Sequence, residues 1–278
     1  MTIRNILVPV ADRPECAVAL GTAFRLAKSL GANVTGCHIR PHTDMAVKLP
    51  KELMRAQLQE REAKALSAAK LFERLAAEFE LPLVKKPRGG SEPSVCWKEM
   101  VGDIPHIFPI MGRTADLIIV SRPKKKGGAL ARQFVTEAML NTGRPVFILP
   151  QRRISAVGRN IAIAWDRGAE AARAVKLALP LLHQADQVTF LEATDEAKLG
   201  PKPKDMAQYL AWHGIRADAI KLKGNQAAEK LIEDCMAENE LDLLIMGAYS
   251  RSRLQQIIFG GVTRYMIHDA QIPLFVMH

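Results

Sequence analysis

The chain has 278 residues, of which 48% are hydrophobic and 24% are charged, a balance typical of soluble globular proteins. No uncharged apolar run approaches the roughly 18 residues that a membrane span needs, and no signal-peptide core follows Met1, so we expect a cytoplasmic protein without membrane attachment. The net charge of +10 comes from Lys and Arg residues spread along the chain, which favours a solvated basic surface over nucleic-acid binding. The four cysteines are scattered without ligand spacing, so we expect reduced thiols and no metal site.

The first elements alternate between strand and helix. Residues 6–10 form a short apolar run, which predicts a strand. Residues 14–30 place apolar residues at helical spacing and end at Gly31, a favourable C-terminal cap. Residues 34–39 are again strand-like, so the chain opens with a strand, a helix and a second strand.

The same alternation continues to the middle of the chain. Residues 50–79 are rich in Ala, Glu and Lys and carry an apolar stripe, which predicts a long helix. A further helix is predicted over residues 92–111. The runs 117–120 and 146–149 are apolar throughout, as expected of strands buried on both faces.

The second half of the chain repeats the first. Three landmarks recur in the same order: residues 4–13 at 159–167, residues 115–121 at 241–247, and residues 144–149 at 272–277. We therefore predict a duplicated domain, with one copy over residues 1–150 and the other over residues 156–278. Strands of the second copy are predicted near residues 160–164, 187–193, 216–222, 242–246 and 273–277.

Alternating strands and helices predict an α/β fold with a parallel, doubly wound sheet in each copy. Such sheets bind ligands beyond the carboxyl ends of their strands, at the point where strand order reverses. Asp12 and Asp166 follow the opening strands of the two copies, and Ser121 and Gly247 follow the later apolar strands. If these strands are neighbours, the residues after them converge on one crevice.

The stretch from Asp242 to Thr263 carries the clearest functional signal. An apolar run ends at Gly247, and Gly260 and Gly261 precede an amphipathic segment. This is the order of strand, glycine-containing loop and helix N-terminus. Glycine allows close approach to the backbone, and a helix N-terminus attracts anions, so the pattern predicts a phosphate-bearing ligand.

These residues resemble the universal stress protein family in a tandem two-domain form, over nearly the whole chain. The resemblance rests on the opening strand that ends in Asp, the glycine motif, and a closing strand introduced by Pro273. It implies two five-stranded sheets of the adenine nucleotide α-hydrolase-like type, with strand order 3-2-1-4-5. Nucleotide-binding members carry Gly-x2-Gly-x9-Gly followed by Ser or Thr, and they bind ATP at the switch point.

The two copies depart from this motif to different extents. In the second copy Ser250 replaces the middle glycine, and Gly261 replaces the Ser or Thr. In the first copy Ser121, Lys124 and Phe134 stand where the three glycines belong, so that copy is interpreted as degenerate. The run from Lys124 to Lys126 is either a solvated loop or a place for an acidic partner or a different anion.

The resemblance implies a nucleotide site in the second copy, with Mg²⁺ where ATP is bound. Its implied residues are Ala164, Trp165, Asp166, Ala193, Met246, Gly247, Tyr249, Ser250, Arg251, Ser252, Arg253, Gly260, Gly261, Val262 and Thr263. Asp166 either contacts the adenine or ribose end or caps the following helix, and both roles can coexist. Trp165 either stacks on a base or packs in the core or an interface, and packing is favoured. Asp12 is expected only to cap its helix.

Two functions are carried forward from the sequence. The first is a stress-response protein of regulatory or signalling role that binds ATP or AMP in its second copy, with at most slow ATP hydrolysis. The second is an adaptor of the same fold that binds no nucleotide and acts on a regulatory protein partner. An enzyme of the wider superfamily is disfavoured, because no catalytic triad, metal cluster or signature loop is visible. The closing strands are expected to adjoin, so that the two copies pair within one chain as family members do in dimers; a homodimer stays open.

Overall fold

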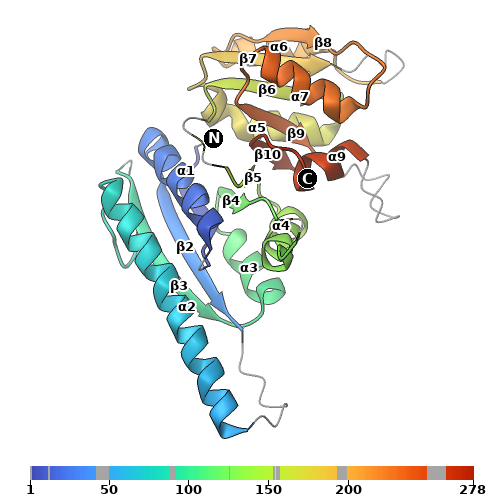
Figure 1. The fold of residues 1–278 in the computed structure, drawn as a ribbon. Helices are drawn as coiled ribbons and strands as arrows, with labels where there is room; N and C mark the ends of the chain where they lie inside the picture. Colours follow the sequence, from blue (N-terminus) through green and yellow to red (C-terminus); the bar gives the residue numbers. More distant parts are fainter. Residues whose placement is uncertain are drawn as a thin grey trace. The chain divides into compact units, whose positions relative to one another are not determined.

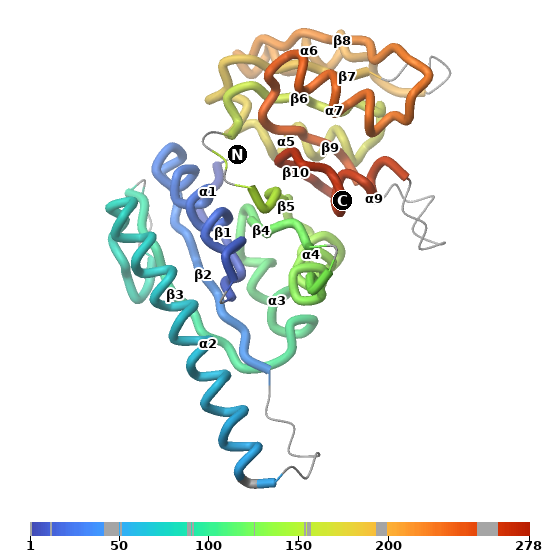
Figure 2. Tube along the Cα trace, in the orientation of Figure 1, coloured from blue at the N-terminus to red at the C-terminus, as the bar shows by residue number. Residues whose placement is uncertain are grey.

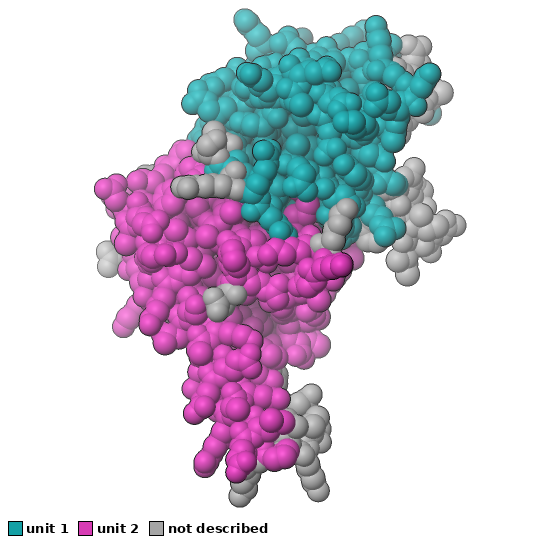
Figure 3. Space-filling model, viewed as in Figure 1, with its two compact units in different colours: residues 1–2, 145–278 teal, residues 3–144 magenta. Residues whose placement is uncertain are grey.

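Strands and helices alternate along the chain (Figures 1 and 2). The structure is a computed structural model that describes residues 2–11, 13–41, 50–87, 90, 92–124, 126–152, 154, 157–192, 199–248 and 261–278. The chain forms two compact units, coloured separately in Figure 3. The first unit comprises residues 3–144, and the second unit comprises residues 1–2 and 145–278.

The first unit is built on parallel strands in the order β3-β2-β1-β4. These strands are β1 (Asn5–Pro9), β2 (Asn33–Arg40), β3 (Ser94–Val101) and β4 (Leu117–Ser121). β1 and β4 are buried along nearly their whole length, as their uninterrupted apolar sequences predict. Strand order reverses between β1 and β4, so their carboxyl ends form the switch point of this unit.

Three of the helices described in this unit connect these strands, and a fourth follows β4. They are α1 (Pro14–Leu30), α2 (Lys51–Glu78), α3 (Ile104–Gly112) and α4 (Ala129–Asn141). α1 packs against α2, where the rings of Phe24 and Phe72 meet edge to face at 5.5 Å, and α3 packs against α4. α1 ends at Gly31, whose φ of 63° is the left-handed cap that the sequence predicts.

The helix predicted over residues 92–111 is wrong, because this segment forms β3 followed by α3. β3 pairs with β2 along its whole length, so the sheet and not a helix satisfies its backbone. Gly102 then turns the chain with a φ of 149°, a conformation that glycine alone adopts readily. Lys98 and Glu99 make the outer half of β3 polar and exposed, which weakens the apolar periodicity that distinguishes a strand from a helix.

The second unit contains a sheet in the order β5-β10-β9-β6-β7-β8. Its strands are β5 (Val146–Leu149), β6 (Asn160–Trp165), β7 (Gln187–Glu192), β8 (Asp218–Lys221), β9 (Leu243–Gly247) and β10 (Leu274–Met277). All neighbours are parallel except β5 and β10. Counted within the second repeat, the five strands β6 to β10 have the expected order 3-2-1-4-5.

The helices described in the second unit are α5 (Ala169–Leu182), α6 (Pro203–Trp212), α7 (Ala228–Glu238) and α9 (Gly261–His268). α5 packs on β9 and β10, and α7 packs against α9. The hydroxyl of Tyr265 in α9 donates a hydrogen bond of 2.8 Å to a carboxylate oxygen of Glu233 in α7. This bond to Glu233 raises the pKa of Tyr265, and it fixes α9 against α7.

The two closing strands adjoin, which confirms that part of the sequence prediction. β5 and β10 pair antiparallel, with Phe147 opposite Phe275 at the centre of the register. Both rings are fully buried and meet edge to face at 6.4 Å. β5 is encoded at the end of the first repeat, yet it belongs to the second unit.

Candidate functional site

The candidate site lies where two neighbouring strands of the second unit end. β6 pairs in parallel with β9, and Ala164 lies opposite Met246. Asp166 follows β6 and Gly247 closes β9, so these residues lie at the same edge of the sheet. Strand order reverses here, with β7 beyond β6 and β10 beyond β9. The structure therefore brings together two strand ends that the sequence singles out, at the kind of edge where doubly wound sheets bind ligands.

Asp166 shapes the turn between β6 and α5. Its Oδ1 accepts a hydrogen bond of 2.9 Å from the backbone N–H of Gly168. Gly168 is itself the N-cap of α5, and among the described residues no side chain caps α5. The bond therefore closes an Asx-type turn that ends at the N-cap residue, and capping by Asp166, one of the two roles that the sequence leaves open, is not what the structure shows. The Asp166 side chain is exposed, so a ligand at this edge can reach it.

Trp165 is a core residue. Only 3% of its surface is exposed, and its ring meets Phe190 edge to face at 5.9 Å. The indole N–H donates a hydrogen bond of 2.8 Å to the carbonyl oxygen of Pro201. The packing role is therefore the one that the structure shows, and the ring supports the segment that follows β7.

An ion pair lies beside Asp166 that the sequence did not predict. Arg167 has a left-handed backbone, with a φ of 62°, and its guanidinium donates to Glu192 Oε1 at 2.7 Å. The two side chains are 9% and 18% exposed, so the pair ties the end of β6 to the end of β7 largely out of water. Gly200 packs so closely that an added Cβ would lie 2.6 Å from the Arg167 carbonyl oxygen. The one available signal was the recurrence of Arg13 as Arg167 in the two repeats.

Packing alone explains why position 247 is a glycine, without reference to a ligand. A Cβ at this position would lie 2.4 Å from the backbone nitrogen of Ala171 and 2.7 Å from the carbonyl carbon of Glu170. Only a residue without a side chain lets the first turn of α5 approach β9 this closely. The close approach therefore brings the helix start onto the strand end, and it sets the geometry of the edge.

The remaining predicted residues fall into two groups. Gly261, Val262 and Thr263 form the first turn of α9, whose backbone N–H groups have no partner within the helix and carry the positive end of its dipole. The others lie outside the described residues: Ala193, Tyr249, Ser250, Arg251, Ser252, Arg253 and Gly260.

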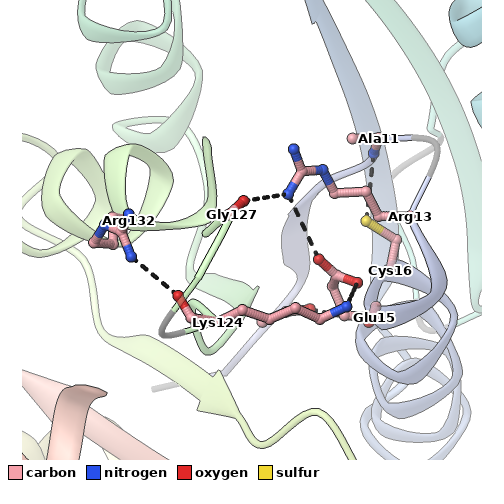
Figure 4. A network of polar contacts seen from close by, with 8 residues as sticks. Ala11, Arg13, Glu15, Cys16, Lys124, Gly127 and Arg132 are labelled. Atoms are coloured by element: carbon pink, nitrogen blue, oxygen red, sulfur yellow. Dashed lines mark hydrogen bonds and ion pairs between the residues drawn. The ribbon is translucent and has the colours of Figure 1, made fainter. Parts of the chain in front are cut away.

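The equivalent edge of the first unit is built differently. Ser121, at the position of Gly247, donates a hydrogen bond of 3.0 Å to the backbone carbonyl of Glu15. Phe134 is 8% exposed and meets Phe108 edge to face at 5.0 Å, so it is anchored in the core between α3 and α4. The loop after β4 is tied to α1 by a polar network around Glu15 and Lys124 (Figure 4).

The described residues hold no group of three or more His, Cys, Asp or Glu side chains arranged to bind a metal ion. Among these same residues, no helix has the length and apolarity to cross a membrane.

Comparison with known proteins identifies the fold and the family. The Universal stress protein family matches residues 2–141 and 158–278. A crystal structure of a universal stress protein from Archaeoglobus fulgidus DSM 4304 aligns with a TM-score of 0.71 and 15% identity, over 98% of this chain and 97% of that one. A functionally unknown protein from Pseudomonas aeruginosa PAO1 aligns with a TM-score of 0.57 and 13% identity, over 99% of this chain and 92% of that one.

At these identities the structural likeness establishes the fold alone. A search of curated proteins gave no match. The family match covers both repeats and agrees with the duplicated α/β architecture, and on this basis the chain belongs to the universal stress protein family as a tandem two-domain member.

Proposed function

We propose that the second unit binds one adenine nucleotide, ATP or AMP, at the edge formed by β6 and β9, and that binding regulates a protein partner in a stress response. The observation that carries this proposal is the pairing of β6 with β9, which aligns the ends of the two strands that lead to Asp166 and Gly247. Family membership supports the proposal, as does the position of the glycine motif, which runs from the end of β9 to the start of α9.

In this proposal the ligand's phosphates lie against the backbone after Gly247 and at the first turn of α9, and the base lies toward Asp166. The N–H groups of Gly261 to Thr263 favour an anion at that helix start, and Thr263 adds a hydroxyl donor. With ATP, Mg²⁺ would bridge phosphate oxygens. Hydrolysis, where it occurs, is expected to be slow, because the described residues near this edge include no general base paired with a nucleophile.

The test is calorimetric titration of the intact chain with ATP and with AMP, with and without Mg²⁺. We expect a stoichiometry near one nucleotide per chain. Asp166→Asn should weaken binding while its amide oxygen keeps the turn to Gly168. Asp186→Asn is the matched control. Asp186 is an exposed carboxylate that lies just before β7, at the amino ends of the strands, where it pairs with Arg159.

Gly260→Val should abolish binding, because a β-branched side chain at the last glycine of the motif blocks close approach of phosphate. Phe134→Ala in the first unit should add no site, since glycine is also missing at positions 121 and 124. Two equivalent sites per chain would contradict the proposal, as would parental affinity in Gly260→Val.

The adaptor function remains the second candidate, and the replacement of the middle glycine by Ser250 favours it. The absence of any heat with ATP or AMP, together with no nucleotide released from the purified protein on denaturation, would select it. The absorbance at 260 and 280 nm after denaturation measures whether the purified protein releases nucleotide.

A further inference from the structure

The first unit contains a polar network at the edge that corresponds to the candidate nucleotide site. A small cavity opens there, between the ends of β1 and β4, and its lining includes Ala11, Arg13, Glu15, Ser121, Leu130 and Phe134. Most of this lining is apolar, and its charged residues are Arg13 and Glu15. The network lies within the first unit, so it can be considered apart from the second.

Glu15 is a buried carboxylate with two cationic partners (Figure 4). Its side chain is 6% exposed and stands in the first turn of α1, where the helix dipole favours negative charge. The Nζ of Lys124 lies 3.4 Å from one carboxylate oxygen, and the Nη1 of Arg13 lies 3.8 Å from the other. The cations are 47% and 35% exposed, so both approach the carboxylate from the solvent side.

The same residues tie the loop after β4 to the start of α1. Arg13 donates to the carbonyl oxygen of Gly127 at 3.3 Å, and Arg132 donates to that of Lys124 at 3.0 Å. Ser121 donates to the Glu15 carbonyl at 3.0 Å. Strand end, loop and helix start are therefore bridged through Glu15 at the place where the glycine motif of this family would otherwise stand.

Two cations and a helix start converge on Glu15. Arg13 and Lys124 bring two positive charges to a helix start that is itself positive, and among the described residues Glu15 supplies the one carboxylate that both of them contact. The Lys124-facing oxygen of Glu15 accepts no hydrogen bond from the part of the chain that the structure describes, so attraction between charges holds this contact. A phosphate offers more acceptor oxygens and would satisfy these cations at least as well.

The second unit shows how the equivalent carboxylate can be neutralised differently. Glu170 stands in the first turn of α5, as Glu15 does in α1. Its carboxylate pairs with Arg173 of the same helix at 3.1 Å. This counter-ion comes from the same helix, whereas in the first unit Lys124 of the loop after β4 contacts the carboxylate in α1.

We propose that the carboxylate of Glu15 is an internal ligand that fills an anion site of the first unit and holds Lys124 against the start of α1, so that inorganic phosphate enters only when that carboxylate is removed from the site. The proposal explains why this copy tolerates the loss of its glycines: no phosphate has to approach the backbone. It does not depend on nucleotide binding in the second unit.

The first experiment titrates the intact chain with inorganic phosphate by calorimetry, and compares the parent with Glu15→Ala. The substitution removes both the carboxylate and the volume that its side chain occupies. We expect one additional phosphate site per chain, bound at least about ten-fold more tightly than by the parent, because a carboxylate no longer repels the ligand. The gain should disappear in Glu15→Ala combined with Lys124→Met.

Phosphate affinity in Glu15→Ala equal to that of the parent would overturn the proposal. A gain that survives Lys124→Met would overturn it as well, since the anion would then lie elsewhere. Any phosphate that binds the second unit contributes equally to all three proteins and cancels in the comparison. Far-ultraviolet circular dichroism checks that each variant is folded.

A second measurement stands even if Glu15→Ala does not fold. Lys124→Met alone should speed amide hydrogen exchange across residues 122–132, because the loop loses its tie to Glu15. Lys126→Met is the matched control, since Lys126 is an exposed lysine of the same loop, two residues along the chain. Unchanged exchange in Lys124→Met, or equal increases in both variants, would show that the pair does not hold the loop.

Discussion

Substitution of Gly247 by alanine tests whether the close packing of α5 against the end of β9 requires glycine at this position. The new Cβ would lie 2.4 Å from the Ala171 nitrogen, whereas ordinary contacts to a Cβ begin at 3.4 Å. The first turn of α5 must therefore move by about 1 Å, and its neighbours in the core with it. Overpacking of this kind costs about 1–3 kcal/mol. Because backbone atoms and not a side-chain tip must yield, we expect a loss of about 2 kcal/mol or more in the free energy of unfolding.

Gly261→Ala is the matched control, because it is the same substitution in the same motif. No atom of the described residues lies within 4 Å of the Cβ that it adds. Alanine also favours the helical backbone by about 0.5–1 kcal/mol over glycine, so this variant should be as stable as the parent or slightly more so.

Urea unfolding followed by tryptophan fluorescence measures both variants. A Trp97→Phe background leaves tryptophans only in the second unit, and Trp165 reports its unfolding because it is 3% exposed. A parent-like midpoint for Gly247→Ala, or an equal loss in Gly261→Ala, would refute the packing argument.

Three further outcomes follow from the described contacts. Phe147→Ala should lower the free energy of unfolding of the second unit by about 3–5 kcal/mol, because the ring is fully buried against Phe275; urea unfolding that matches the parent would contradict this. Since the hydrogen bond to Glu233 raises the pKa of Tyr265, this bond stabilises the fold below the ordinary tyrosine pKa and is lost as pH rises through the raised one; Glu233→Gln should move one phenolate step in a 295 nm titration to lower pH. Burial raises the pKa of the Cys37 thiol to about 12, so a thiol reagent at pH 8 should modify it only after unfolding, and fast labelling of native protein would show that the site opens.

The sequence predicts those parts of the fold that depend on local composition. Strands buried on both faces, such as β4 and β9, are continuous apolar runs and were found in place. The exception is β3, which is polar along its outer half and lies at the edge of the order β3-β2-β1-β4. Its strand conformation depends on pairing with β2, a contact that periodicity along the chain does not encode.

The candidate site was predictable to the level of strand ends, but not of side-chain partners. Repetition of the Asp-containing strand indicated the edge near Asp166. The pair of Arg167 with Glu192 and that of Glu15 with Lys124 join residues far apart in sequence, so they require knowledge of which strands are neighbours. The sequence also leaves open whether Gly247 is required for ligand binding or for the packing of α5, because both require a residue without a side chain.

The antiparallel pairing of β5 with β10 determines which fragments of the protein keep the edge of β10 covered. A fragment of residues 158–278 matches one family segment, yet it lacks β5 and leaves the edge of β10 bare. An uncovered apolar strand recruits another strand, so such a fragment should associate with a second copy of itself as its concentration rises. A fragment that begins at residue 145 carries its own covering strand. Duplication has thus produced a chain in which the sequence repeat and the compact unit of the fold begin at different residues.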